Sequence, residues 1–162
     1  GINNYFPDFV TTDEAAPLGA RALSPAELRE AGFELTSMGW PVMGKALEDL
    51  LLHLEERYHP GEISITENGA AFEDGVEDGR VEDPRRTRYY HEYISAVWQA
   101  IQKGAPVKSY FAWSLLDNFE WGYGYAQRFG IVYVDFETQA RIPKATFDWY
   151  RQTIAANAVS ED

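Results

Sequence analysis

The chain has 162 residues, and its 26 Asp and Glu residues against 14 Lys and Arg residues give a formal net charge of −12. This charge excludes nucleic-acid binding through a general basic patch, because a polyanion would be repelled. Cysteine is absent, which excludes disulfides and thiolate sites, and the most apolar stretch, residues 107–116, is far shorter than the roughly 20 residues that span a bilayer.

The first third of the chain predicts a strand, a long surface segment and a helix. Gly1–Phe6 mixes Ile, Tyr and Phe and predicts a strand, and residues 11–37 predict a long surface loop because they are rich in Ala, Pro, Gly and acids. Within this loop Ser24 and Pro25 predict the cap and first position of a short helix. Apolar residues at helical spacing then predict an amphipathic helix that ends at residues 59–61: Leu47, Leu50, Leu51, Leu54 and Tyr58.

The middle of the chain predicts a second strand and a second helix. Residues 62–66 form a short strand that stops at Glu67, and a loop rich in Gly and acids follows, whose Glu73-Asp74 pair is interpreted as solvated charge. Asp83 is the predicted N-cap of the next helix. The apolar face of that helix, which ends at Lys103-Gly104, is predicted to contain Tyr90, Ile94, Val97 and Ile101.

The last third predicts a buried strand, a loop, a further strand-like run and a final helix. Residues 106–113 are nearly continuously apolar, the pattern of a strand covered on both faces, and Phe111 is predicted to be core. Residues 114–128 form a long loop, residues 130–136 a strand-like run, and residues 143–156 a helix. This alternation favours parallel βα units, but periodicity alone leaves a doubly wound sheet and a (β/α) barrel open.

Two carboxylates and several tryptophans are the best candidates for a site. Glu67 and Glu120 both follow predicted strands, where barrel active sites are built, and Trp113 and Trp121 flank the second loop. Aromatic faces beside carboxylates suit sugars, and glycosidic bond cleavage uses paired carboxylates. The structural alternatives are a turn acid for Glu67, a solvated loop acid for Glu120 and core positions for the aromatics.

These residues lie in motifs of a known family. Ile65-Thr66-Glu67-Asn68-Gly69 resembles the signature around the catalytic nucleophile of family 1 glycoside hydrolases, the β-glucosidase and β-galactosidase group. Residues 110–121 and 128–135 resemble the last barrel strand and sugar-binding loop of that family, and Gly1-Ile2-Asn3 and Met38-Gly39-Trp40 fall in register. The resemblance implies an α/β fold, in which residues 1–162 form the C-terminal part, about strands 6 to 8, of a single (β/α)8 TIM-barrel domain.

The resemblance also implies a role for each matching residue. Glu67 would be the nucleophile, and Tyr5 would hydrogen-bond it and hold it oriented and ionised. Among the implied substrate-binding residues, Asn3 would provide an amide near the nucleophile and Trp113 the floor for the glycone ring. Glu120 and Trp121 would bind the outer hydroxyls of that ring. Phe129 would be a wall residue and Trp40 a platform for the aglycone. The resemblance implies neither a metal nor an organic cofactor.

The family's acid/base motif, Asn-Glu-Pro, does not occur in the sequence. We therefore expect a retaining β-glycosidase fragment that acts on terminal β-D-glycosides when an N-terminal barrel polypeptide completes it. The alternative is a non-catalytic part-barrel that self-associates or binds sugars without hydrolysis, since three strands would leave open edges. The absence of Cys and the acidic balance fit a bacterial cytoplasmic enzyme, and no membrane partner is expected.

Overall fold

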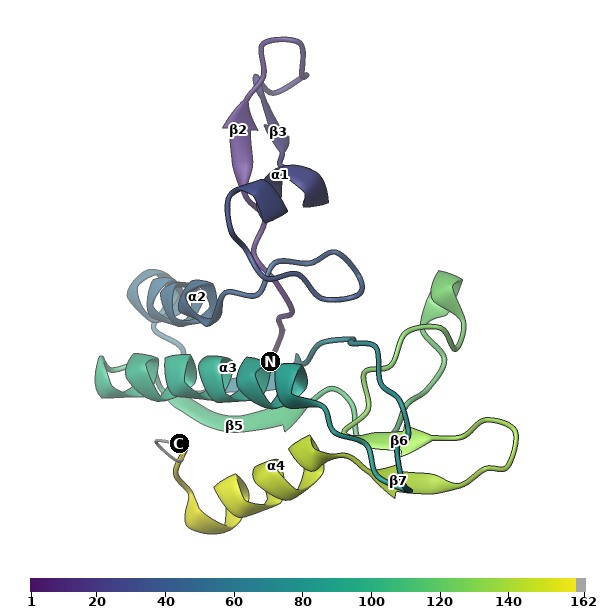
Figure 1. The fold of residues 1–162 in the computed structure, drawn as a ribbon. Helices are drawn as coiled ribbons and strands as arrows, with labels where there is room; N and C mark the ends of the chain where they lie inside the picture. Colours follow the sequence, from purple (N-terminus) through teal and green to yellow (C-terminus); the bar gives the residue numbers. More distant parts are fainter. Residues whose placement is uncertain (160–162) are drawn as a thin grey trace.

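The structure, a computed structural model that describes residues 1–159, is built on a three-stranded parallel sheet (Figure 1). The strand order is β1-β4-β5, with β1 at Ile2–Asn3, β4 at Ile63–Asn68 and β5 at Val107–Ala112. Ile65 pairs with Ile2 on one side and with Tyr110 on the other. The predicted parallel βα organisation is therefore confirmed, with β4 extended through Glu67 to Asn68.

Three long helices cover the sheet. They are α2 (Gly44–Tyr58), α3 (Pro84–Gln102) and α4 (Ala145–Ala156), and α3 runs between the other two (Figure 1). The apolar faces of α2 and α3 pack with the inner side chains of β4, because burial of these faces is what stabilises an amphipathic helix. The centre of this core contains Leu47, Leu51, Ile65, Tyr89, Tyr90, Tyr93 and Val97.

The C-terminal end of α2 and the N-terminal end of α3 can both be compared with the sequence prediction. The predicted end of α2 is confirmed, since His59 takes the left-handed conformation with φ of 44° and ends the helix. Asp83 is the N-cap residue of α3, as predicted, but its side chain makes no cap hydrogen bond there. Its Oδ1 instead accepts from the backbone N–H of Thr146, at 2.8 Å, in the first turn of α4. Asp83 therefore ties the beginnings of two helices together.

The predicted surface loop over residues 11–37 contains more structure than expected. Strands β2 (Val10–Thr12) and β3 (Ala20–Ala22) form an antiparallel hairpin that projects from the body together with helix α1 (Pro25–Glu30) (Figure 1). The cap of α1 is confirmed as a capping box between Ser24 and Glu27. Arg21 of β3 donates to both oxygens of Glu27, at 2.9 and 2.7 Å, and so holds the hairpin against the helix.

The strand-like run over residues 130–136 also differs from a barrel strand. It forms β6 (Val132–Val134), which pairs antiparallel with β7 (Arg141–Pro143) outside the parallel sheet. The final helix therefore begins at Ala145, two residues after the predicted start. The loop between β5 and β6 contains the short 3₁₀ helix η1 (Trp121–Tyr123).

Several residues predicted to be buried are exposed. Phe111 of β5 is 57% exposed, so its assignment to the core is wrong for residues 1–159. Tyr58 and Ile101 of the predicted helix faces are also exposed. Since β5 is an edge of the sheet, no described strand pairs with its outer side. No helix within the described range has the length and apolar character needed to cross a bilayer.

Candidate active site

Glu67 and Tyr5 are joined by a short hydrogen bond at the carboxyl ends of the strands. Parallel pairing sets Asn3 of β1 opposite Glu67 of β4, and the backbone N–H of Asn4 donates to the Glu67 carbonyl at 2.9 Å. This register brings the Tyr5 hydroxyl to 2.6 Å from Oε2 of Glu67, to which it donates. Burial, together with the Glu67 hydrogen bond and charge, raises the pKa of Tyr5 above its usual range, so the hydroxyl stays a proton donor at neutral pH.

Gly69 is required by a close approach of two strands. Gly69 is not among the glycines with positive φ, so it is not needed for a left-handed turn. A Cβ at this position would lie 1.8 Å from the carbonyl oxygen of Trp113. The backbone N–H of Trp113 also donates to the Asn68 carbonyl at 2.7 Å. The chain segment that carries Glu67 is therefore held directly against the segment that carries Trp113.

Glu120 lies within electrostatic reach of Glu67. Burial first, and then the negative charge of Glu67, raises the pKa of Glu120 above its ordinary value. The backbone of Glu120 is fixed by two hydrogen bonds to the turn around η1, from its N–H to the Gly124 carbonyl and from Tyr123 to its own carbonyl. The structure thus brings together the two carboxylates that the sequence places 53 residues apart.

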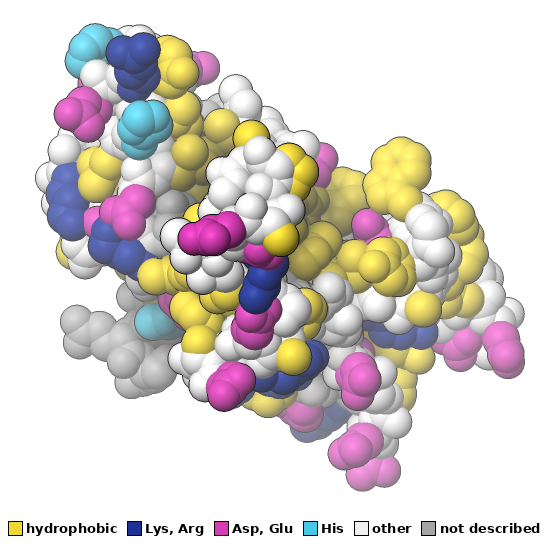
Figure 2. Space-filling view, turned by 90° about the horizontal axis from the view of Figure 1, so that it is seen from above, with side chains coloured by type: hydrophobic (Ala, Val, Ile, Leu, Met, Phe, Trp, Pro, Cys, Tyr) yellow, Lys and Arg dark blue, Asp and Glu magenta, His cyan; other side chains and the backbone are white. Residues whose placement is uncertain are grey.

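Trp121 is a strongly exposed residue among those predicted for the site. It is 82% exposed and has a positive φ of 37°, a conformation that is rare for a bulky residue and is often found at functional sites. Figure 2 shows hydrophobic side chains gathered on the right-hand flank, where η1 and its loop lie. The exposed apolar side chains of this loop are Leu115, Leu116, Phe119, Trp121, Tyr123 and Tyr125.

Trp40 and Phe129 surround the ring of Tyr5. The centroid of the Tyr5 ring lies 5.7 Å from that of Trp40 and 6.1 Å from that of Phe129, the latter at an edge-to-face angle of 81°. Trp40 also stacks on Phe6 at 4.6 Å. Phe129 is only 3% exposed and packs against both Tyr5 and Trp40. Asn3 is exposed, and its Oδ1 lies 2.6 Å from the hydroxyl of Thr66.

The loop that carries Glu120 is anchored by a buried carboxylate that the sequence interpretation missed. Asp117 accepts from Arg128 at 2.6 Å, from Lys144 at 3.0 Å, and from the backbone N–H groups of Gly130 and Val134 at 2.9 and 3.3 Å. Its side chain is inaccessible to solvent. Asp117 belongs to the motif that carries the resemblance, but no local pattern links it to Lys144, which lies 27 residues away.

Asp74 extends this network, so the interpretation of Asp74 as a solvated charge is wrong. Its side chain is 1% exposed and binds Arg86, at 2.8 Å, and Lys144, at 2.6 Å. Burial opposes the charge of Arg86, but the hydrogen bonds and charges of Asp74 and Asp83 outweigh it and raise the pKa of Arg86. Burial and the Arg86 charge lower the pKa of Lys144. The network therefore pairs three acids with three cations, because isolated buried charges are costly. The acids are Asp74, Asp83 and Asp117, and the cations are Arg86, Arg128 and Lys144.

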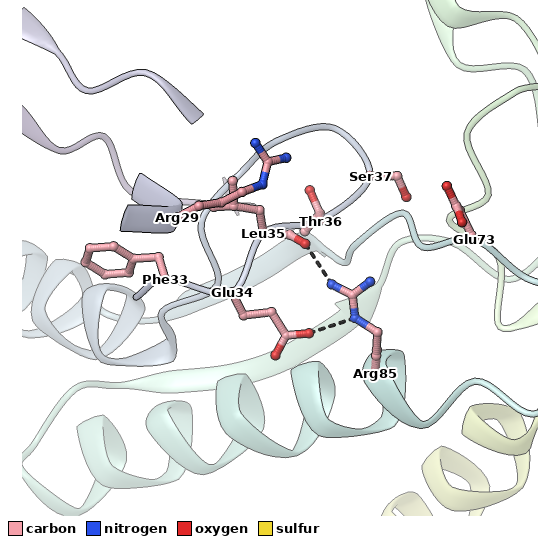
Figure 3. A pocket seen from close by; sticks show the side chains of 8 residues that line it. All are labelled: Arg29, Phe33, Glu34, Leu35, Thr36, Ser37, Glu73 and Arg85. Carbon is pink, nitrogen blue, oxygen red and sulfur yellow. Dashed lines mark hydrogen bonds and ion pairs between the residues drawn. The ribbon is translucent and has the colours of Figure 1, made fainter. Parts of the chain in front are cut away.

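A polar cavity of about 410 Å³ lies apart from these residues (Figure 3). Arg85 crosses it, donating to Oε1 of Glu34 and to the carbonyl of Leu35, both at 2.8 Å. Leu35 bridges Pro41 across the turn that carries Trp40. None of the predicted site residues lines the cavity. The contacts of Arg85 connect the turn that carries Trp40 to α3. The walls of the cavity are Arg29, Phe33, Glu34, Leu35, Thr36, Ser37, Glu73 and Arg85.

The arrangement is suited to chemistry at a sugar ring. A carboxylate oriented by a hydroxyl, a second carboxylate nearby and aromatic rings on neighbouring loops are the parts from which glycosidase sites are built. Among residues 1–159 no group of three or more His, Asp or Glu side chains is placed to hold a metal ion.

Comparison with known proteins connects this geometry to a family. The sequence model described as Glycosyl hydrolase family 1 matches residues 1–159. Beta-glucosidase A of Thermotoga maritima is 44% identical over 162 residues, which is 99% of this chain and 35% of that protein. Beta-glucosidase of Agrobacterium sp. is 44% identical over 150 residues, or 93% of this chain and 32% of that protein.

Solved structures agree with these sequence matches. A family 1 β-glucosidase from Thermotoga maritima superposes with a TM-score of 0.90 at 44% identity, covering 98% of this chain and 35% of that chain. The Thermotoga maritima enzyme in complex with glucoimidazole gives a TM-score of 0.88 at 43% identity, covering 97% and 34%. The chain therefore spans about a third of the length of these relatives, and its sheet is part of an α/β TIM barrel.

Proposed function

The chain belongs to glycosyl hydrolase family 1, and from this premise we propose that it supplies the nucleophile and the glycone-binding residues of a retaining β-glucosidase. The complete enzyme hydrolyses terminal β-D-glycosides, and an N-terminal barrel portion completes its active site. The observation that carries this proposal is the 2.6 Å hydrogen bond from Tyr5 to Glu67 at the carboxyl end of β4. Solved complexes of the Thermotoga maritima relative with glucoimidazole and with deoxynojirimycin support a sugar-like substrate.

Glu67 acts as the nucleophile in the first step. Tyr5 holds Oε2, so Oε1 attacks the anomeric carbon, a covalent glycosyl-enzyme bond forms, and the bond to the leaving oxygen breaks. An acid/base carboxyl group gives its proton to that oxygen. The same group then removes a proton from water, which attacks the anomeric carbon and releases Glu67 and the sugar with its configuration retained.

The remaining residues bind the sugar. Trp113 is the floor for the glycone ring, while Glu120 and Trp121 bind its outer hydroxyls from the loop after β5. Asn3 lies opposite Glu67 in the strand register and presents its amide near the same centre. Trp40 is the platform for the leaving group and Phe129 is a wall residue of the site. The contacts of both rings with Tyr5 support these assignments.

The acid/base carboxyl group comes from the N-terminal portion. Retention requires two carboxyl groups about 5 to 5.5 Å apart, and the chain contains no Asn-Glu-Pro motif. Glu120 is assigned to sugar binding and does not take this role. The exposed Phe111 and the unpaired outer side of β5 support the need for a complementary polypeptide.

Chemical rescue tests the proposal. Residues 1–162 are joined to the part of Thermotoga maritima β-glucosidase A that precedes its matching third, and Glu67→Ala is compared with Glu73→Ala, an exposed acid on the following loop. We expect Glu67→Ala to lose turnover of aryl β-glucosides and to form the α-glucosyl azide when azide is added. Glu73→Ala should keep turnover. Full turnover by Glu67→Ala would overturn the nucleophile assignment. An inactive assembly whose tryptophan fluorescence still shifts with glucose would favour a non-catalytic sugar-binding module.

A further inference from the structure

Asn68, the residue after the proposed nucleophile, has a fully buried side chain that joins three segments. Its Nδ2 donates to the carbonyl of Asn4 at 2.8 Å and to the hydroxyl of Tyr89 at 3.0 Å. Its Oδ1 accepts from the hydroxyl of Tyr110 at 2.5 Å. One amide therefore fixes the end of β4 to the segment after β1, to α3 and to β5.

The hydroxyl of Tyr89 continues this chain of hydrogen bonds to Tyr5. While it accepts from Asn68, its proton points to the carbonyl oxygen of Tyr5 at 3.1 Å. Tyr93, stacked on Tyr89 with ring centroids 4.2 Å apart, donates to the same carbonyl at 3.3 Å. The backbone of the residue that orients Glu67 is thus held by two tyrosines of α3.

Tyr90 holds the proposed glycone floor in the same way. Its hydroxyl donates to the carbonyl oxygen of Trp113 at 3.1 Å. A Cβ at Gly69 would lie 3.0 Å from the Tyr90 hydroxyl oxygen. The Tyr90 hydroxyl therefore lies close to the contact between the segments that carry Glu67 and Trp113. Because Trp113 donates to Asn68 at that point, both polar backbone atoms of Trp113 are fixed.

These hydroxyls remain protonated donors. Burial is the first cause that raises the pKa of Tyr89, of Tyr90 and of Tyr110 above the usual range. Phenylalanine would fill nearly the same apolar volume at each position, so the hydroxyl groups themselves need an explanation. Their partners are atoms of Tyr5, Asn68 and Trp113, which are the proposed site residues or their immediate neighbours.

We propose that Tyr89 and Tyr90 of α3, with Tyr110 of β5, are positioning residues for glycoside hydrolysis. Their hydroxyls set the spacing between Glu67, Tyr5 and Trp113, and they act on the reaction only through these residues. The inference rests on the proposed function of Glu67. It gives α3 a part in catalysis although none of its side chains is assigned to touch the sugar, because small misplacements of reacting groups are costly.

Three tyrosine-to-phenylalanine variants test this inference in the assembled enzyme described above. Tyr90→Phe and Tyr110→Phe each remove one hydroxyl that holds the site, and Tyr150→Phe is the matched control. The Tyr150 hydroxyl bonds only strand backbone, at 3.4 Å from the Tyr110 carbonyl, and its ring packs parallel to Tyr90. We expect kcat for an aryl β-glucoside to fall about tenfold in each test variant, the factor that corresponds to about 1.4 kcal/mol or one hydrogen bond.

Separate measurement of kcat and KM distinguishes a positioning role of these tyrosines from an effect on the stability of the fold. We expect KM to change less than about twofold in the test variants, and Tyr150→Phe to keep the kcat of the unsubstituted enzyme. An active assembly in which Tyr90→Phe keeps full kcat, or in which Tyr150→Phe loses as much, overturns this inference alone. If Tyr90→Phe does not fold, Tyr110→Phe decides by the same criteria. An inactive unsubstituted assembly overturns the proposed function, and this inference with it.

Discussion

Glu67 and Glu120, the two carboxylates of the proposed site, have different surroundings. The Glu67 carboxylate is half-buried and accepts a hydrogen bond from the Tyr5 hydroxyl, whereas Glu120 lies on a loop whose backbone is fixed by the turn around η1. Burial and the neighbouring charge raise the pKa of Glu120. Such a separation of environments lets one carboxylate react while the other binds hydroxyl groups.

The raised pKa of Glu120 predicts an acid-side change in substrate affinity. An acid with a raised pKa loses its charge at a higher pH than an ordinary glutamic acid, whose value is 4.5. Because the ionised form accepts hydrogen bonds at both oxygens, we expect KM of the assembled enzyme to rise as the pH falls through this raised pKa. In Glu120→Gln we expect KM to be high throughout and to lack this rise. Steady-state kinetics between pH 4 and 8 measure it, and an unchanged acid limb in the variant would refute the binding role of Glu120.

At the scale of elements, the loop between β5 and β6 depends on buried charge. Asp117 holds Arg128 and Lys144 while its own side chain is inaccessible to solvent. Arg128 also lies over the ring of Tyr133 at 4.0 Å, so the carboxylate, the cation and the ring fix both ends of the loop that presents Glu120 and Trp121.

Removal of the Asp117 charge should therefore destabilise this part of the fold. Asp117→Asn keeps the shape but removes the carboxylate partner of Arg128 and one of the two carboxylate partners of the buried Lys144. Loss of a buried ion-pair partner costs about 3 to 5 kcal/mol. The midpoint of urea unfolding measures this loss. Asp148→Asn is the matched control, since Asp148 pairs with Arg151 on the exposed face of α4 and surface pairs contribute little. Equal midpoints for the two variants would contradict the structural role of Asp117.

The elements that the sequence predicts best are those with a long repeating pattern. The helices α2 and α3 and the strand β4 bury residues at regular spacing, so local periodicity is enough to find them. The hairpin of β2 and β3 lacks such a pattern, because β3 is exposed at all three positions and β2 at two of three. Its pairing depends on backbone hydrogen bonds that leave no mark in hydropathy.

Prediction from the sequence has the same limit at the candidate site. Glu67, Glu120 and the tryptophans could be found because they follow strands and lie in a specific motif. The burial of Asp74 could not, because its partners Arg86 and Lys144 lie 12 and 70 residues away. An acid in a Gly-rich loop has the same local sequence whether it is solvated or paired, so only the tertiary structure distinguishes the two.

At the scale of the whole molecule, the parallel sheet has an open edge at β5. Edge strands with exposed apolar side chains invite pairing with another chain, and Phe111 is 57% exposed on edge strand β5. The proposed completion by an N-terminal barrel portion accounts for this surface. When residues 1–162 are present alone, the same surface is available for self-association.

We therefore expect Phe111→Ser to reduce self-association of the 162-residue chain. Sedimentation velocity over a range of concentrations measures the fraction of monomer. Leu18→Ser is the control, because Leu18 is 93% exposed but lies between β2 and β3, in the hairpin that projects from the body. If both variants shift the distribution equally, general surface hydrophobicity rather than the β5 edge is responsible.

The central claim is that Glu67 is the nucleophile of a β-glycosidase. Incubation of the assembled enzyme with dinitrophenyl 2-deoxy-2-fluoro-β-glucoside, followed by peptide mass spectrometry, tests it most directly, because the fluorine slows release of the covalent intermediate. We expect one fluoroglucosyl group on the peptide that contains Glu67, and none in the presence of an excess of deoxynojirimycin. Labelling at another carboxylate, or hydrolysis of an aryl β-glucoside without any trapped intermediate, would contradict it.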